Sequence, residues 1–247
     1  MHVLILGGTT EASALAQLLA DAPLSATLSL AGRTQNPTLP PIDCRIGGFG
    51  GAEGLAAWMR EHRVTALIDA THPFASRMPF HAAQAAISTG IPLLSLLRPA
   101  WQRQSKDQWL EVEDHAAAIT ALGAEPRRVF LTVGRMELAA YATEPQHFYV
   151  IRSIDPVAPR PLPHAVWLTG RGPFTVESEQ ALMAEHRIEY LISKNSGGSA
   201  TEAKLIAARM LRLPVILIRR PPRPDAKHVA TAEEAIQWIL CIHGLSS

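Results

Sequence analysis

The segment Met59-Arg60-Glu61-His62-Arg63-Val64 has a near copy 124 residues later, Met183-Ala184-Glu185-His186-Arg187-Ile188. Each copy leads into a short apolar run, and different polar residues follow the two runs. The first run is followed by Asp69-Ala70-Thr71-His72-Pro73 and the second by Ser193-Lys194-Asn195-Ser196. Ligands of parallel α/β sheets bind where the strands end. The repeat therefore predicts one fold that is used twice and carries two different sites.

The same order of elements runs through both halves of the chain. An apolar run meets a glycine at Gly7 and again at Gly134. The last helix of each half has a predicted N-cap residue, Asp114 in the first half and Thr231 in the second. Between these points, short apolar runs alternate with amphipathic segments. This alternation is typical of parallel sheets that carry helices on both faces.

The matched order predicts the fold class and the domains. We expect an α/β protein of two structurally duplicated, Rossmann-like three-layer domains with parallel sheets, residues 1–125 and 126–247. The boundary falls near Glu125-Pro126, where the connection is short. A short connection also permits a strand to be exchanged between the halves.

The composition excludes several classes of protein. The chain has 247 residues, of which 47% are hydrophobic and 18% charged, and its formal net charge is +1. This charge gives no reason to expect nucleic acid as a partner. No apolar stretch has the length of a membrane span, and the first residues lack the pattern of a signal peptide. Cys44 and Cys241 form neither a disulfide pattern nor a zinc motif, so we expect a cytoplasmic protein without a metal.

The turn after the first strand has the composition of a phosphate-binding site. Gly7-Gly8-Thr9-Thr10-Glu11-Ala12 joins the first apolar run to the first helix. Glycines let the backbone approach a phosphate, and the helix N-terminus offers N–H groups and a positive dipole end. The same residues also suit a tight turn that is capped by threonine and binds nothing. The pattern is not the full dinucleotide fingerprint.

Arg33 and the tip of a later strand favour a nicotinamide cofactor. Arg33 follows the second apolar run, where an acidic residue would bind the ribose 2′-hydroxyl of NAD. An arginine suits the 2′-phosphate of NADP instead, although a solvated surface arginine is the alternative. Thr71 and His72 end a strand near the expected nicotinamide end. His72 remains open as a proton donor, a cofactor contact or a structural cap.

The second half carries cations at the corresponding strand tips. Four successive tips hold Arg135, Arg152, Arg171 and Lys194. If the sheet is parallel, these side chains converge on one crevice that suits a polyanion. The glycine-containing loops around them add further predicted ligand-binding residues: Gly134, Asn195, Ser196, Gly197 and Lys204. A reduced nucleotide and an anionic substrate that meet between two sheets predict a reductase, in which the cofactor supplies the hydride.

Five segments follow one another along the chain: Leu6-Gly7-Gly8-Thr9-Thr10-Glu11-Ala12, Asp69-Ala70-Thr71-His72-Pro73-Phe74-Ala75, Arg98-Pro99-Ala100-Trp101, Thr132-Val133-Gly134-Arg135 and Lys194-Asn195-Ser196-Gly197-Gly198. In this order they resemble segments of the precorrin-6A reductases, the CobK/CbiJ family. The resemblance spans the whole chain. It implies NADPH-dependent reduction of a double bond in precorrin-6A, giving precorrin-6B, during cobalamin synthesis.

The resemblance also gives the predicted sites their ligands. It implies NADPH in residues 1–125 and a tetrapyrrole with acetate and propionate groups in residues 126–247. It further implies other enzymes of the corrin pathway as partners. Water, His72 and Lys194 remain alternative donors of the proton that the ring receives. The substrate with cobalt and the substrate without it also remain alternatives. The alternative is a non-catalytic two-lobed protein that binds an anionic ligand. A short-chain dehydrogenase is disfavoured because no tyrosine has a lysine four residues later.

Overall fold

The computed structural model describes residues 1–32 and 40–245. The chain forms two compact units, Met1–Pro99 with Pro221–Ser247 as unit 1, and Ala100–Arg220 as unit 2. Each unit contains a six-stranded sheet in which all paired strands are parallel. The expected α/β class with two duplicated, Rossmann-like sheets is therefore confirmed.

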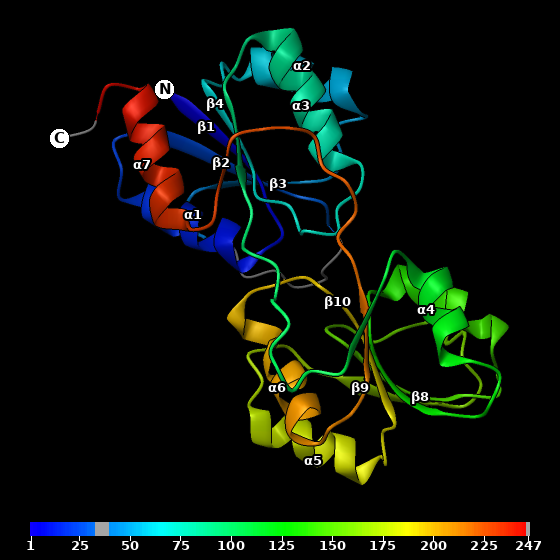
Figure 1. Ribbon diagram of the computed structural model, residues 1–247. Coiled ribbons are helices and arrows are strands. Elements are labelled where there is room, and N and C mark those ends of the chain that lie inside the picture. Colours follow the sequence, from blue (N-terminus) through cyan, green and yellow to red (C-terminus); the bar gives the residue numbers. More distant parts are fainter. Residues whose placement is uncertain (33–39, 246–247) are drawn as a thin grey trace. The chain divides into compact units, whose positions relative to one another are not determined.

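Unit 1 is a three-layer arrangement. Its strands lie in the order β12-β5-β4-β1-β2-β3. Figure 1 shows α1 and α7 on one face of this sheet and α2 and α3 on the other. The bounds are β1 (His2–Leu6), α1 (Thr10–Ala20), β2 (Ser25–Leu30), β3 (Asp43–Ile46), α2 (Ala52–Glu61), β4 (Ala66–Asp69), α3 (Met78–Thr89), β5 (Leu93–Leu96), β12 (His228–Val229) and α7 (Ala232–Ile242).

Successive residues of β1 supply both cores of unit 1, because side chains of a strand alternate between the faces of its sheet. Val3 and Ile5 pack in a cluster with residues of α1 and α7. Leu4 and Leu6 pack in a second cluster with residues of α2 and α3. All four side chains are buried, which is why the strand is apolar throughout and not alternating.

Unit 2 repeats this arrangement with strands in the order β6-β11-β10-β7-β8-β9. Figure 1 shows α5 and α6 on one face of its sheet and α4 on the other. The bounds are β6 (Trp109–Val112), α4 (His115–Leu122), β7 (Arg128–Thr132), η1 (Arg135–Thr143), β8 (Phe148–Ser153), β9 (Ala165–Thr169), α5 (Val176–Glu185), β10 (Tyr190–Lys194), η2 (Ser199–Thr201), α6 (Ala203–Met210) and β11 (Val215–Ile218). The connection between β7 and β8, η1, is a 3₁₀-helix, whereas the corresponding connection between β1 and β2 in unit 1 is the α-helix α1.

The repeated segment has the same backbone in both units. Arg63 and Arg187 both adopt a left-handed conformation, with φ of 51° and 50°. Val64 N–H donates to the Met59 carbonyl, and Ile188 N–H donates to the Met183 carbonyl, each at 2.9 Å. These bonds close the end of α2 and of α5 in the same way, and the chain then enters a central strand. The Glu-His-Arg repeat is therefore scaffold.

The predicted domain boundary near residue 125 is wrong. The two halves of the chain do exchange strands, as the short connection between them permits. β6 and α4 precede residue 125 but belong to unit 2, where β6 pairs with β11. β12 and α7 belong to unit 1, where β12 pairs with β5 and α7 packs against α1. Hydrophobic periodicity identifies a strand, but it does not specify which sheet edge the strand joins.

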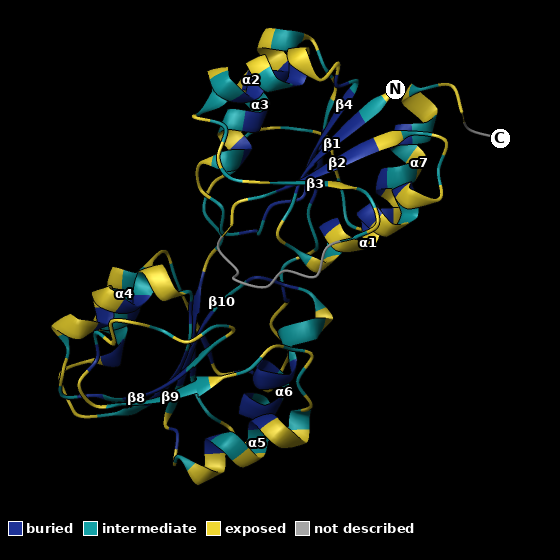
Figure 2. Ribbon diagram, turned by 180° about the vertical axis from the view of Figure 1, so that it is seen from behind, coloured by how far each residue is buried: buried dark blue, intermediate teal, exposed yellow. Residues whose placement is uncertain are grey.

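The buried residues follow the sheets. Figure 2 shows the buried colour along the central strands of each unit and the exposed colour on the outer surfaces of the helices. Both predicted N-caps are present: Ala117 N–H donates to Asp114, and Thr231 forms a capping box with Glu234. Among residues 1–32 and 40–245, no helix has both the length and the apolar character that a membrane span requires.

The exchanged helix α7 offers a test of the fold. Ile239 is fully buried in the core of unit 1, whereas Ile242 on the same helix is 39% exposed. We expect Ile239→Ala to lower the free energy of unfolding by about 2–5 kcal/mol, because it leaves a cavity. Ile242→Ala should change it by less than about 0.5 kcal/mol. Urea unfolding followed by circular dichroism measures both values. Equal stability of the two variants would contradict the packing of α7 on unit 1.

Candidate functional site

Both sheets reverse their strand order at one point. In unit 1, β1 lies between β2 and β4, and in unit 2, β7 lies between β8 and β10. Consecutive βα connections leave opposite sides of such a strand, so a crevice opens at the carboxyl ends of the strands. The predicted residues after β1, β4, β7 and β10 therefore lie at the positions that this fold uses for ligands.

The turn after β1 is built as a cradle. Gly8 has φ of 118°, a backbone conformation that residues other than glycine rarely adopt. Thr9 caps α1: its hydroxyl accepts from Ala12 N–H at 3.1 Å and donates to the Ala70 carbonyl at 2.9 Å. The second bond joins this turn to the end of β4. The N–H groups of the first turn of α1 have no partners within the helix, and they lie at its positive dipole end.

Glu11 has a partner that the sequence did not predict. Its carboxylate forms an ion pair with Arg98 at 2.8 Å, and both side chains are mostly buried. This pairing reduces the repulsion that Glu11 would exert on an anion at the N-terminus of α1. Thr10, beside it, is exposed. Arg33 lies outside the described residues, so its predicted contact with a 2′-phosphate remains a prediction.

The loop between β4 and α3 is held by a buried carboxylate. Asp69 Oδ1 accepts from the Thr71 hydroxyl at 2.6 Å and from Thr71 N–H at 3.1 Å. Asp69 Oδ2 accepts from Arg223 Nη2 at 2.5 Å. Next along the loop, His72 Nδ1 accepts from Phe74 N–H at 3.2 Å. Thr71 and His72 therefore sit on a loop whose shape depends on Asp69.

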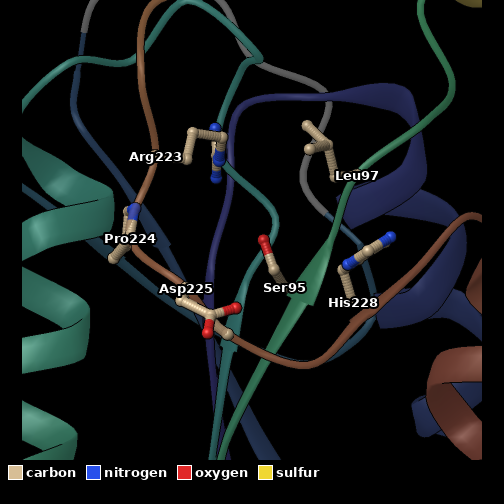
Figure 3. A pocket seen from close by; sticks show the side chains of 7 residues that line it. Ser95, Leu97, Arg223, Pro224, Asp225 and His228 are labelled. Atoms are coloured by element: carbon tan, nitrogen blue, oxygen red, sulfur yellow. The ribbon is translucent and has the colours of Figure 1, made fainter.

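A pocket of about 360 Å³ lies beside β5 and β12 in unit 1. Figure 3 shows Ser95 on β5 and places Arg223, Pro224 and Asp225 on the segment that approaches β12. His228, in β12, lies on the other side of Ser95 from these three residues. The two halves of a dinucleotide bind on opposite sides of the strand-order reversal. The pocket is on the side away from β2 and β3. This is the side that the nicotinamide half would use.

Gly134 and Lys194 are brought together in unit 2 by a carboxylate that the sequence analysis did not single out. Lys194 Nζ donates to Glu137 Oε1 at 3.1 Å. Burial alone would raise the pKa of Glu137, but the charge and hydrogen bond of Lys194, with smaller effects of His115 and a backbone hydrogen bond, lower this pKa from 4.5. A Cβ atom on Gly134 would lie 2.3 Å from Glu137 Oε2, so the glycine provides the space for this side chain.

His115 and Tyr141 lie beside this ion pair. His115 Nδ1 and the Tyr141 hydroxyl are 3.0 Å apart, and the direction of the bond depends on the histidine tautomer. Burial lowers the pKa of His115; the Glu137 charge opposes this shift and the Lys194 charge adds to it. His115 is therefore neutral at neutral pH. Burial likewise raises the pKa of Tyr141, which keeps its hydroxyl protonated.

Arg152 does not contribute a free positive charge. Its guanidinium forms a two-pronged ion pair with Glu179, with Nη2 3.0 Å from Oε2, and lies 3.5 Å from the centre of the Phe174 ring. The two charged side chains are 11% and 1% exposed. The predicted cluster of four cations is thus partly neutralised, because Glu179 and Glu137 compensate Arg152 and Lys194.

Arg135 and Arg171 are the exposed members of the predicted cluster. Arg135 begins η1 at the tip of β7. Arg171 lies in the loop between β9 and α5. A Cβ atom on Gly172 would lie 2.8 Å from the carbonyl oxygen of Ala200, so this loop packs closely against η2. The absence of a side chain at Gly172 thus allows the Arg171 loop to approach the loop after β10.

The loop after β10 is tied to Trp101. The Asn195 side chain accepts from Trp101 N–H at 2.8 Å and donates to the Trp101 carbonyl at 3.2 Å. The Trp101 indole N–H donates to the Gly198 carbonyl at 3.0 Å. Lys204, which is 5% exposed, donates to the Thr201 carbonyl at 2.9 Å and lies 5.0 Å from the Trp101 ring centre. Asn195 and Lys204 therefore organise the loop from inside.

The remaining predicted residues of this loop, Ser196 and Gly197, are buried beside them. Six residues that hold these loops were not predicted as site residues: Arg98, Trp101, His115, Glu137, Arg220 and Arg223. One signal was present, since the two Arg-Pro pairs at Arg98 and Arg220 are part of the repeat. Their partners are far away in the sequence, so local patterns do not reveal the contacts.

Comparison with known proteins identifies the family of this chain. The family model described as "Precorrin-6x reductase CbiJ/CobK" matches residues 2–240. The chain is 50% identical to precorrin-6A reductase of Rhodococcus erythropolis over 240 residues, covering 96% of this chain and 97% of the relative. It is 27% identical to cobalt-precorrin-6A reductase of Priestia megaterium over 253 residues, covering 96% and 98%.

The solved structures give the same result. The structure described as "CobK precorrin-6A reductase" superposes with a TM-score of 0.93 at 46% identity, covering 100% of this chain and 98% of that one. The likeness extends over both units and includes every segment on which the resemblance was based. The chain therefore belongs to the precorrin-6x reductase family, CbiJ/CobK.

Proposed function

We propose that this protein reduces a double bond of the precorrin-6A macrocycle with NADPH, giving precorrin-6B in cobalamin biosynthesis. The observation that carries the proposal is the match over nearly the whole chain to relatives that are named precorrin-6A reductase. The proposed setting is the cytoplasm, alongside other enzymes of the corrin pathway. The two sheets supply the two binding functions that such a reductase needs.

Unit 1 is the proposed cofactor unit. The conformation of Gly8 and the cap formed by Thr9 support a pyrophosphate at the N-terminus of α1. Gly7, Thr10 and Glu11 complete this turn. Thr71 and His72 border the nicotinamide side, where the pocket beside β5 gives room for a ring. Arg33 is the proposed partner of the 2′-phosphate, which distinguishes NADPH from NADH.

Unit 2 is the proposed tetrapyrrole unit. The substrate is a large ring fringed with carboxylates, and Arg135 and Arg171 are exposed residues whose guanidinium groups suit such carboxylates. Lys194 adds a third cation, which Glu137 holds at the end of β10. The backbone from Gly134 and from Asn195 to Gly197 shapes the floor of this proposed site. Arg152 and Lys204 support it from within.

Reduction of a ring double bond requires a hydride and a proton. Bound NADPH supplies the hydride. Besides water, His72 at the end of β4 and Lys194 at the end of β10 are the groups that can donate the proton. The Lys194–Glu137 contact is 3.1 Å long and keeps the lysine charge close to a carboxylate. The protein contributes orientation and charge compensation.

The direct test is a spectrophotometric assay with the full-length protein. Mixing it with NADPH and metal-free precorrin-6A should lower the absorbance of the reduced nicotinamide in step with loss of precorrin-6A. Omitting the tetrapyrrole should abolish the change. A parallel assay with the cobalt-loaded ring identifies the preferred substrate. Tetrapyrrole binding without NADPH oxidation would instead support the two-lobed binding protein.

The cofactor assignment predicts a selective effect at Arg33. Arg33→Ala should raise the KM for NADPH about 10- to 100-fold, because charge-assisted hydrogen bonds of about 1.5–3 kcal/mol are lost. The KM for NADH should change little, since NADH has no 2′-phosphate. Steady-state kinetics with both cofactors measures this. Equal losses for the two cofactors would contradict the assignment.

The arginines of unit 2 should separate into two classes. Arg171→Ala or Arg135→Ala should raise the KM for precorrin-6A about tenfold and leave the KM for NADPH unchanged, and Arg171→Ala should also leave the melting temperature unchanged. Arg152→Ala should instead destabilise the fold by about 3–5 kcal/mol, because it leaves Glu179 buried without its partner. Kinetics and thermal unfolding of the same variants test this division. A precorrin KM that is unchanged in the Arg135 and Arg171 variants would remove both from the substrate site.

A further inference from the structure

The segment that leads from unit 2 back to unit 1 is bonded to a site loop in each unit. In unit 2, Arg220 Nε donates to the Asn195 carbonyl at 2.9 Å, and its Nη2 donates to the Ser196 carbonyl at 3.1 Å. Three residues later, in unit 1, Arg223 donates to Asp69 at 2.5 Å. Only Pro221 and Pro222 separate the two arginines, so this short segment holds the loop after β10 and the loop after β4.

The Arg223–Asp69 pair is nearly buried. The side chains of Arg223 and Asp69 are 12% and 4% exposed. Arg223 Nη1 is buried and has no hydrogen-bond partner among the described residues, so Asp69 is the hydrogen-bond partner that defines the place of this guanidinium. Removing one member of such a pair leaves the other charged and poorly solvated. The pair therefore has a strong influence on where the Asp69 carboxylate lies.

The positions of the next residues in the loop depend on Asp69. The Asp69 oxygen that is not bonded to Arg223 accepts both the hydroxyl and the N–H of Thr71. Between them, the Ala70 carbonyl accepts from Thr9, the residue that caps α1. A displaced Asp69 would consequently shift Thr71 and the capping bond of Thr9 together. Both belong to the cofactor site that is proposed above.

We infer that Arg223 is a positioning residue for the cofactor site, which it shapes through Asp69. This rests on the proposed NADPH function of unit 1. It means that the N-terminal strands and helices do not form the complete cofactor site by themselves, since the site requires a side chain from the segment after unit 2. Arg223 also lines the pocket beside β5, so this segment forms one wall of the nicotinamide side (Figure 3).

The test compares NADPH binding by full-length variants, measured by the fluorescence of the reduced nicotinamide. Arg223→Ala should raise the Kd for NADPH about tenfold, as small displacements at a site have large effects. Arg223→Lys, which keeps the charge but not the guanidinium, should lie between this variant and the wild type. The KM for precorrin-6A should remain unchanged. Arg219→Ala is the matched control, because Arg219 is on the same segment and pairs with exposed Glu111 and Glu113.

A double variant tests the route through Asp69 and avoids an unpaired buried charge. The Kd for NADPH of the double variant Arg223→Ala with Asp69→Asn should be within about twofold of the Kd of the single variant that binds NADPH more weakly. The reason is that Arg223 acts through Asp69, so that the two losses do not add. Additive losses would show that Arg223 acts independently of Asp69 and would overturn the inference. The inference would also be overturned if Arg223→Ala and Arg223→Lys bound NADPH with the same Kd as Arg219→Ala, whatever their melting temperatures.

NADPH binding by the wild-type protein distinguishes failure of this inference from failure of the proposed function on which it rests. A wild-type protein that binds no NADPH would overturn the proposed function, and the inference with it. Wild-type binding together with unaffected Arg223 variants would overturn the inference alone. Selective loss in those variants, with normal binding in the control, supports both.

Discussion

The pairing of β5 with β12 and of β11 with β6 completes both sheets and sets the path of the chain. A parallel strand needs a long connection to reach its neighbour, and each sheet takes its sixth strand from the other half of the repeat. The chain therefore passes between the units twice, after Pro99 and again after Arg220. Unit 1 is complete only when residues 221–247 have returned to it.

These two passages explain why the organising contacts lie where they do. Arg98 and Trp101 flank the first passage, and Arg220 and Arg223 flank the second. Arg98 is bonded to Glu11 and Arg223 to Asp69 in unit 1, whereas Trp101 and Arg220 are bonded to the loop after β10 in unit 2. The segments that connect the units are thus the same segments that shape the predicted ligand loops.

Charge compensation is the second organising principle. Carboxylates that the sequence analysis did not connect to the strand tips accept hydrogen bonds from Lys194 and Arg152, and Asp69 accepts one from Arg223. Buried charges require such partners, because an unpaired charge in the interior costs far more than a solvated one. Two of the four predicted cations, Arg152 and Lys194, are thus paired with carboxylates, and the other two residues, Arg135 and Arg171, are exposed.

Local patterns in the amino-acid sequence predict the secondary-structure elements, the duplication and the family. Apolar runs, the caps at Asp114 and Thr231 and the repeated Glu-His-Arg segment are local patterns, and hydrogen bonds within a few residues realise them. The sheet that receives β6 or β12, and the acid that faces each predicted cation, become known only from the folded chain. The partners of Arg223, Lys194 and Arg98 are 154, 57 and 87 residues away. Such contacts depend on how the chain crosses between sheets, and no periodicity within one segment encodes that.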